Sequence, residues 1–195
     1  MKIQLGGKSL KWLGFDLEAR PLSWMGGDWV TREITAIGWK FIGDRGKPYV
    51  VLLGQEMTAK EMLQRFLEYY NDADAVTGHY IRGYDLPTLN QAMLEYGLPP
   101  LPAKLSHDTK NDLLRLQGNS KSLENLAATL GVQGKKVGMS QADWREANRL
   151  LPEGLKKTAR RVASDVELQI EVRAALMERG YLGRPKVWRP SGGGK

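Results

Sequence analysis

The sequence predicts an α/β domain built on a central mixed five-stranded sheet that is flanked by helices. A length of 195 residues and a hydrophobic content of 42% suit one globular domain with a substantial apolar core. Three strand-like segments come first, which indicates an antiparallel meander. Strands then alternate with helices, which is typical of parallel strands joined by crossovers. We expect one domain over residues 1–183 and a basic, flexible tail over residues 184–195.

The meander is expected near the N-terminus. Its strands are predicted over residues 11–19, 34–42 and 49–53. The first strand carries Asp16-Leu17-Glu18 near its end and leads into residues 20–32, which are rich in Gly, Pro and Trp and indicate a loop. The glycines and the proline of residues 43–48 suit a hairpin turn between the other two strands.

Strands and helices alternate after the meander. Thr58 and Glu61 have the spacing of a capping box, which opens an amphipathic helix that reaches Asn71. A second helix is expected to end at Gly97, because glycine readily adopts the left-handed conformation that closes a helix. A buried strand is expected over residues 75–80, the second helix over residues 85–96 and the last strand over residues 104–109.

The C-terminal part of the chain is predicted to be helical. The helices are expected over residues 123–130, 141–151 and 153–179. Gly131 stops the first of them, and Ser140 caps the second. Residues 131–138 carry two lysines and indicate a flexible loop, and the tail from Gly183 is basic and glycine-rich, with no periodicity.

Composition limits the chemistry and the partners. The chain has no cysteine and only two histidines, His79 and His107, so any metal must be held mainly by oxygen atoms. A formal net charge of +7 favours a polyanionic partner, although a merely basic soluble protein would have the same charge. Since no apolar run approaches the roughly 18 residues of a membrane span and no secretory signal is visible, we expect a cytoplasmic protein with no membrane partner.

Four acidic residues form the candidate site, and each has a structural alternative. Asp16 and Glu18 share one face of an apolar strand, where two carboxylates repel each other unless a cation lies between them; a solvent-exposed strand end is the alternative. Asp85 stands where a helix N-cap would, so a capping role is its alternative. Asp165 lies one helical turn beyond Arg161, so a surface ion pair is the alternative there.

The order and context of these acids resemble the DEDD family of 3′-5′ exonucleases, which includes the proofreading exonucleases of replicative DNA polymerases. The chain has "FDLEARP", "GHYIRGYDLPTL" and "RVASDVEL" in the family's order. Between the second and third motifs, "DTKNDLLRLQGNSKSLENLAATLG" is similar to the family's DT strand end and SLENLA helix. The resemblance extends over nearly the whole chain and implies a ribonuclease H-like fold.

The resemblance also implies an activity, namely hydrolysis from the 3′ end of single-stranded DNA or RNA with two Mg²⁺ or Mn²⁺ ions. The implied catalytic and metal-holding residues are Asp16, Glu18, Asp85 and Asp165. Asp16 is expected to contact both ions, with Glu18 and Asp165 on the side of the attacking water and Asp85 on the side of the leaving oxygen. The resemblance further implies a polymerase or another replication protein as a partner.

The third motif departs from the family pattern. The family has a general base, Tyr four residues or His five residues before the final Asp, and here those positions hold Arg161 and Arg160. A guanidinium group cannot accept a proton at any working pH. Activity could therefore be weak, could rely on the metal ions alone, or could use His107 or Tyr84 as the base. The expected substrate-binding residues are Arg160, Arg161, Tyr84 and His79, with the arginines suited to a phosphate.

Two other functions stay open at this stage. A non-catalytic or weakly active nucleic-acid-binding module of the same fold would bind phosphate after chelation and release no nucleotides. An endonuclease of the ribonuclease H or junction-resolvase kind would make internal cuts. A small-molecule α/β enzyme is disfavoured, because no Gly-rich phosphate loop follows a strand. The sequence alone does not choose between DNA and RNA.

Overall fold

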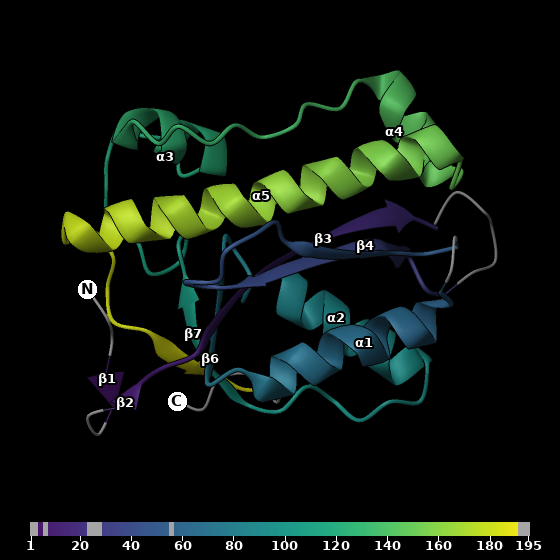
Figure 1. Ribbon diagram of the computed structural model, residues 1–195, viewed down its shortest axis with the longest axis horizontal. Coiled ribbons are helices and arrows are strands. Elements are labelled where there is room, and N and C mark those ends of the chain that lie inside the picture. The colour runs from purple at the N-terminus through teal and green to yellow at the C-terminus, as the bar shows by residue number, and fades with distance from the viewer. Residues whose placement is uncertain (1–3, 6–7, 23–28, 55–56, 191–195) are drawn as a thin grey trace.

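A computed structural model describes residues 4–5, 8–22, 29–54 and 57–190 of the chain (Figure 1). Its central sheet has six strands in the order β5-β4-β3-β6-β7-β8. These strands are β3 (Trp12–Pro21), β4 (Arg32–Phe41), β5 (Tyr49–Leu52), β6 (Ala75–Gly78), β7 (Lys104–Asp108) and β8 (Lys186–Trp188). Two short strands, β1 (Gln4–Leu5) and β2 (Lys8–Ser9), pair separately as an antiparallel ribbon.

The sheet is mixed, as the sequence predicted. Strands β3, β4 and β5 form the antiparallel meander. Strands β6 and β7 then add in parallel beside β3, so the polypeptide must cross over through α1 (Ala59–Asp72) and α2 (Asp85–Glu95). The predicted α/β class with antiparallel and parallel strands flanked by helices is therefore confirmed.

The sixth strand, β8, was not expected. Residues 186–188 pair antiparallel with β7, although the sequence predicted a flexible tail from residue 184 and a last strand at β7. The Ser106 hydroxyl donates to the carbonyl oxygen of Lys186 over 2.9 Å, which adds a side-chain contact to the backbone pairing. A three-residue strand between two prolines carries no detectable alternation, so its position is set by the free edge of β7 rather than by a local signal.

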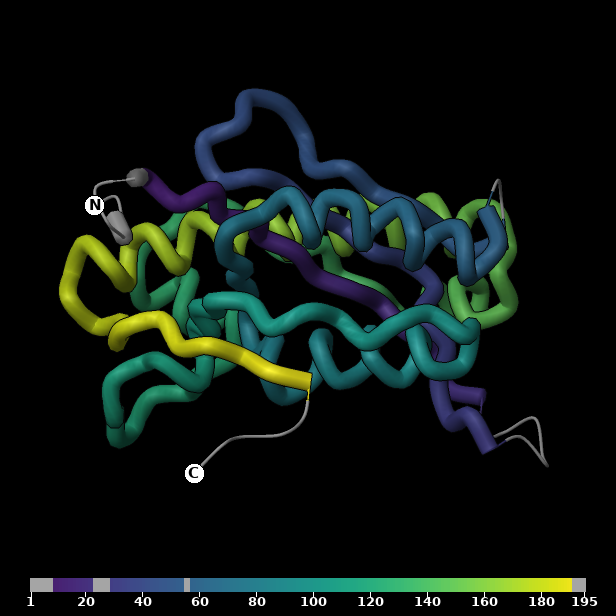
Figure 2. Tube along the Cα trace, turned by 90° about the horizontal axis from the view of Figure 1, so that it is seen from below, coloured from purple at the N-terminus to yellow at the C-terminus, as the bar shows by residue number. Residues whose placement is uncertain are grey.

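Helices cover both faces of the sheet, which gives three layers (Figures 1 and 2). Helices α1 and α2 lie on one face. The long helix α5 (Pro152–Glu178) crosses the other face, and α3 (Leu123–Leu130) and α4 (Gln141–Asn148) pack on its outer side. The predicted capping box at Thr58 is present, and Gly131 ends α3 with a φ of 72°, as expected for a glycine there.

The alternation of β3 separates the core from the site. Phe15 and Leu17 are buried in the main apolar core, where the Phe15 ring lies 5.1 Å from that of Phe66 on α1. Asp16 and Glu18 consequently face α5 on the other side. Within the described residues, no helix is both long enough and apolar enough to cross a membrane.

Candidate metal centre

Two glycines bring α5 close to the sheet beside the acids. A Cβ atom at Gly38 would lie 3.1 Å from a methyl carbon of Val162, and one at Gly14 would lie 2.8 Å from the Ile170 side chain. Gly38 on β4 is the direct cross-strand neighbour of Asp16. The absence of side chains at these two positions therefore lets α5 approach the strand face that carries the acids.

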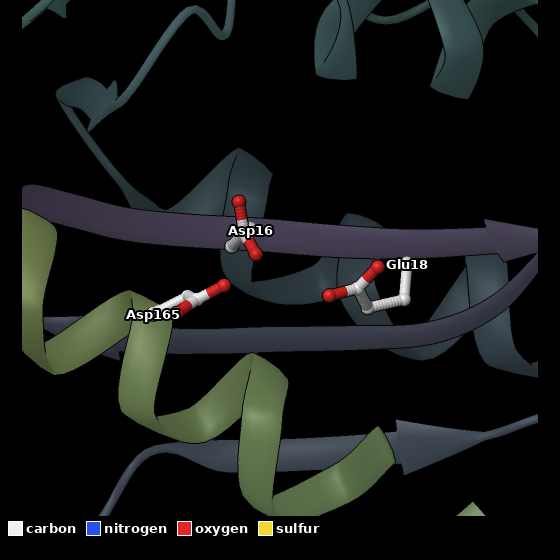
Figure 3. A group of neighbouring side chains, drawn as sticks. All are labelled: Asp16, Glu18 and Asp165. Atoms are coloured by element: carbon white, nitrogen blue, oxygen red, sulfur yellow. The ribbon is translucent and has the colours of Figure 1, made fainter. Parts of the chain in front are cut away.

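Three carboxylates meet where α5 crosses β3 (Figure 3). One oxygen atom from each of Asp16, Glu18 and Asp165 lies within 4.8 Å of the other two. Asp165 is buried, with 3% of its surface exposed, and it extends from α5 toward the two β3 acids. The structure thus brings together three of the four acids that the sequence singled out.

Asp85, the fourth acid, lies at the edge of this group. It lines the same cleft, but its carboxylate is not among the three that converge within 4.8 Å. The alternative role as a helix N-cap is wrong, because Tyr84 is the N-cap residue of α2 and no side chain caps that end. Asp85 is nonetheless buried, with 2% of its surface exposed, and its charge raises the pKa of Asp16.

Burial and mutual repulsion make the ionised acids costly without a cation. Burial, and then the charges of Asp85, Asp165 and Glu18, raise the pKa of Asp16 well above its usual value. Burial also raises the pKa of Asp85 to about 8 and that of Asp165 to about 6, in the latter case against the opposing charge of Lys136. A bound cation would reverse these shifts, because it stabilises the charged carboxylates.

Two carboxylate oxygens have no partner at all among the described residues. Asp85 Oδ1 and Asp165 Oδ1 are both buried and accept no hydrogen bond. A buried, unpartnered acceptor is costly, which is why such atoms usually have a protein, water or metal partner. The donor set consists of carboxylate oxygens, which suit Mg²⁺ or Mn²⁺. The residues therefore fit a divalent cation.

Arg161 stands where the DEDD exonucleases that the chain resembles have a Tyr base, and it does not form the surface ion pair with Asp165. Its Nε donates to Glu18 Oε1 over 2.6 Å, and its Nη1 donates to the carbonyl oxygen of Val137 over 2.9 Å. The guanidinium carbon lies 5.1 Å from the centre of the Trp144 ring. Arg161 is thus fixed on three sides.

Lys136 is the cation that pairs with Asp165. Its Nζ lies 3.2 Å from Asp165 Oδ2 and 3.4 Å from Glu124 Oε1 on α3. Sequence reasoning missed both Lys136 and Glu124, since the only signal was a pair of lysines in a loop without periodicity. Their role depends on how the loop between α3 and α4 returns to α5, which local pattern does not reveal.

The acids lie in a cleft of about 330 Å³. Of the expected substrate-binding residues, Arg161, Tyr84 and His79 line it, whereas Arg160 is exposed on α5 and is not part of its lining. Further lining residues that the sequence did not single out include Tyr80, Lys110, Ser122, Leu123, Glu124 and Lys136.

The two candidate replacement bases are unsuited to that role. The His107 side chain is buried outside the cleft lining, where its Nε2 contacts the carbonyl oxygen of Gly183 at 2.8 Å and burial lowers its pKa to about 4. Tyr84 does line the cleft, but burial raises its pKa, so its hydroxyl stays protonated at neutral pH. The structure offers neither as a proton acceptor for water.

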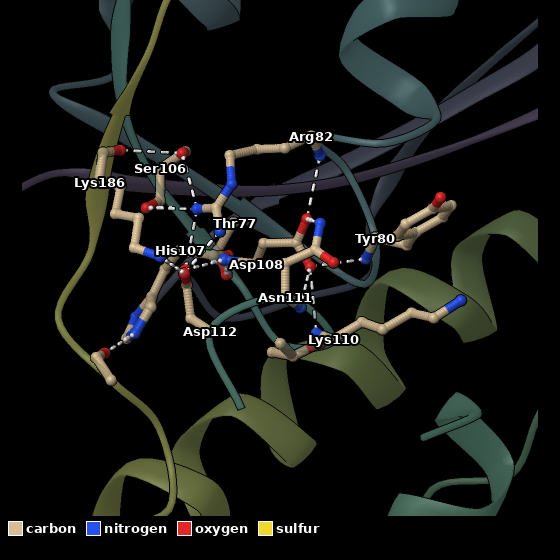
Figure 4. A network of polar contacts seen from close by, with 12 residues as sticks. Thr77, Tyr80, Arg82, Ser106, His107, Asp108, Lys110, Asn111, Asp112 and Lys186 are labelled. Carbon is tan, nitrogen blue, oxygen red and sulfur yellow. Dashed lines mark hydrogen bonds and ion pairs between the residues drawn. The ribbon is translucent and has the colours of Figure 1, made fainter. Parts of the chain in front are cut away.

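A buried polar network shapes the loop that precedes Asp85 (Figure 4). The Asp108 carboxylate accepts backbone hydrogen bonds from Tyr80 and Arg82, each over 3.0 Å. The Arg82 guanidinium in turn donates to both oxygens of Asp112 over 2.9 and 2.5 Å. These contacts hold Tyr80 at a φ of 69°, a conformation that is uncommon for a residue with a side chain. The network therefore supports the cleft wall rather than the acids themselves.

Comparisons with known proteins agree with this architecture. A family model for the RNase H superfamily, named RNase_H_2, matches residues 13–146, which is more than half of the chain. A solved structure, the family B DNA polymerase from the hyperthermophilic archaeon Pyrobaculum calidifontis, is similar with a TM-score of 0.65 and 16% sequence identity. The match covers 87% of this chain and 25% of the polymerase chain, so this chain spans a quarter of that protein's length. No curated protein matches.

Proposed function

This chain belongs to the RNase H superfamily, and from that premise we propose that it is a metal-dependent nuclease that hydrolyses single-stranded nucleic acid from the 3′ end. The observation that carries the proposal is the convergence of Asp16, Glu18 and Asp165 within 4.8 Å in the lining of one cleft. The buried, unpartnered oxygens of Asp85 and Asp165 support it, because an ion-free acidic site of this kind is energetically unfavourable.

The four acids would hold two Mg²⁺ or Mn²⁺ ions, and Asp16 is the acid on which the charges of the other three act. Such ions supply a water nucleophile at neutral pH and neutralise the charge that develops on the phosphate. The superfamily match ends at residue 146, before Asp165, so the contribution of α5 rests on the geometry of the cluster.

The remaining cleft residues are suited to holding the substrate. Arg161 keeps Glu18 in a fixed orientation through its Nε contact and presents positive charge to the cleft. Lys110 and Lys136 add two ammonium groups, which favour a phosphate backbone. Tyr80, 39% exposed at the cleft wall, adds an aromatic side chain that can contact a base, with the Lys110 ammonium group 4.0 Å from its ring centre.

Exonuclease action from the 3′ end is the finer part of the proposal. It rests on the order of the acidic motifs, which resembles the DEDD exonucleases, and on the likeness to a DNA polymerase chain of which this chain covers one quarter. Coverage of 25% of the polymerase chain is the extent expected of one domain within a larger enzyme. A polymerase or another replication protein is therefore the partner that we propose.

The experiment is digestion of 5′-labelled single-stranded DNA and RNA with Mn²⁺, Mg²⁺ or EDTA. We expect a ladder that shortens from the 3′ end only when metal is present and that is lost in Asp16→Ala. Asp44→Ala is the matched control, because Asp44 is an exposed acid in the turn between β4 and β5. Its activity should equal that of the unchanged protein.

Other outcomes would select the alternatives. Internal fragments would indicate a ribonuclease H-like endonuclease. Intact substrate in every condition, with binding that survives EDTA, would replace the proposal with a non-catalytic binding module. Equal activity in Asp16→Ala and the unchanged protein would place the reaction outside this cleft.

A further inference from the structure

The cation paired with Asp165 reaches the site from outside the acidic elements. Lys136 lies in the loop between α3 and α4, and its side chain is 23% exposed, whereas that of Asp165 is 5% exposed. Its Nζ lies between Asp165 Oδ2 (3.2 Å) and Glu124 Oε1 (3.4 Å). The ammonium group therefore occupies one side of the Asp165 carboxylate, which a metal ion in this site would also contact.

The backbone beside Lys136 is anchored independently of that ion pair. The backbone nitrogen of Val137 donates to Ser164 Oγ over 3.1 Å, and its carbonyl oxygen accepts from Arg161 Nη1 over 2.9 Å. Both partners belong to α5, the helix that carries Asp165. The loop can thus stay docked on α5 while the four-carbon side chain of Lys136 moves.

Glu124 gives the displaced ammonium group a second position. It lies in the first turn of α3, its side chain is 57% exposed, and it is not one of the three converging acids. A cation that moves from a buried carboxylate to an exposed one pays a smaller desolvation penalty. Glu124 is therefore a low-cost alternative partner for Lys136.

We propose that Lys136 is an internal competitor of the metal, which shields Asp165 in the empty site and transfers to Glu124 when a divalent ion binds. This inference rests on the proposed metal-dependent function and describes how that site is regulated. Its consequence is that removal of Lys136 strengthens metal binding, whereas removal of the Glu124 charge weakens it, because Lys136 then has Asp165 as its only carboxylate partner in this group.

The test is a titration with Mn²⁺, without nucleic acid, in which free Mn²⁺ is measured by electron paramagnetic resonance. We expect Lys136→Met to lower the Kd for Mn²⁺ about 10-fold, the effect of an ion pair worth roughly 1.4 kcal/mol. Glu124→Gln should raise the Kd about 3-fold, on the order of an exposed charge contact. Lys136→Arg, which keeps the charge, should stay within about 2-fold of the unchanged protein.

Lys110→Met and Lys135→Met are the matched controls. Lys110 lines the same cleft but lies over the Tyr80 ring at 4.0 Å, and Lys135 is an exposed neighbour in the same loop. Both should change the Kd by less than about 2-fold, because each removes a nearby positive charge without freeing Asp165. An equal tightening in Lys110→Met would show a general charge effect and would overturn the competition.

The outcomes also separate this inference from the proposed function. An unchanged or weaker Kd in Lys136→Met, beside clear Mn²⁺ binding by the unchanged protein, would reject the competition and leave the metal site standing. Tighter binding in Lys136→Met without any nuclease activity would support the competition and reject the nuclease. If neither protein binds Mn²⁺, both are rejected. If Lys136→Met does not fold, the exposed substitution Glu124→Gln is the deciding variant. An unchanged Kd for Mn²⁺ in Glu124→Gln would contradict the transfer of Lys136 to Glu124.

Discussion

Arg161 Nε donates to Glu18 Oε1 over 2.6 Å and so ties α5 to β3 at the acidic cleft. Arg161 stands four residues before Asp165, where the exonucleases that the chain resembles have a Tyr base. Both side chains of the pair are only 15% exposed, and the second Arg161 contact, to Val137, fixes the guanidinium further. The residue at the base position therefore acts as a counter-ion of Glu18.

Removing this counter-ion should destabilise the metal-free protein. In Arg161→Gln, Glu18 would face Asp16 and Asp165 without its cation, so we expect the free energy of unfolding in EDTA to fall by about 1–3 kcal/mol. Mn²⁺ should restore much of the loss, because the ion replaces the lost charge. Urea denaturation in EDTA and in Mn²⁺ measures both values. Lys156→Gln, on an exposed face of the same helix, is the control and should stay within about 0.5 kcal/mol.

The acids also predict how stability depends on pH. The folded-state pKa of Asp85 is raised to about 8 and that of Asp165 to about 6, from an ordinary value of 3.8. Between about pH 4 and pH 8 these two acids therefore hold more protons in the folded protein than in the unfolded chain, so their contribution to stability falls as pH rises. We expect the midpoint of urea unfolding in EDTA to decrease from pH 5 to pH 8.

Two variants check this assignment. Asp85→Asn removes the ionisable group, so the decrease in the urea midpoint between pH 6 and pH 8 should become smaller. In the unchanged protein, saturating Mn²⁺ should oppose this decrease, because the ion binds the ionised acids. Asp112 serves as a contrast. Burial alone would raise its pKa, but the hydrogen bond from Arg82 and the other contacts lower it, so its contribution to stability is lost only in acid. A slope that is identical in Asp85→Asn would assign it to other groups.

The close approach of α5 to Gly38 should control metal affinity. A methyl group in Gly38→Ala would lie 3.1 and 3.3 Å from the two methyl carbons of Val162, so the helix must shift by a few tenths of an ångström. We expect a loss of about 1 kcal/mol in stability and a several-fold weaker Mn²⁺ affinity, because Asp165 moves away from Asp16. Adding Val162→Ala to Gly38→Ala should recover the affinity. Without recovery, the effect would not lie in this contact.

The sequence predicted most elements of the fold because their signals are local. Alternation along β3 predicted that Asp16 and Glu18 share a face, and a capping box predicted the start of α1, as the structure confirms. The pairing of Lys136 with Asp165 was not predictable, since the two residues are brought together by a loop without periodicity. The contact of Arg161 with Glu18 was not predictable either, since helical spacing offered only Asp165 as a neighbour whereas the tertiary fold supplies Glu18.

The strand β8 leads to the last prediction, because it places residues 186–188 of the expected flexible tail at the edge of the sheet. Trp188 packs against the main core, whereas Val187 is 52% exposed on the same strand. Trp188→Ala should therefore lower the free energy of unfolding by about 1–2 kcal/mol, the value of a partly buried aromatic side chain, and Val187→Ala should change it by less than about 0.5 kcal/mol. Chain truncation after Arg184 should cost at least as much as Trp188→Ala, since it also removes the backbone pairing with β7. Equal stability of the truncated and full-length chains in urea would show that the β7 edge does not need this strand.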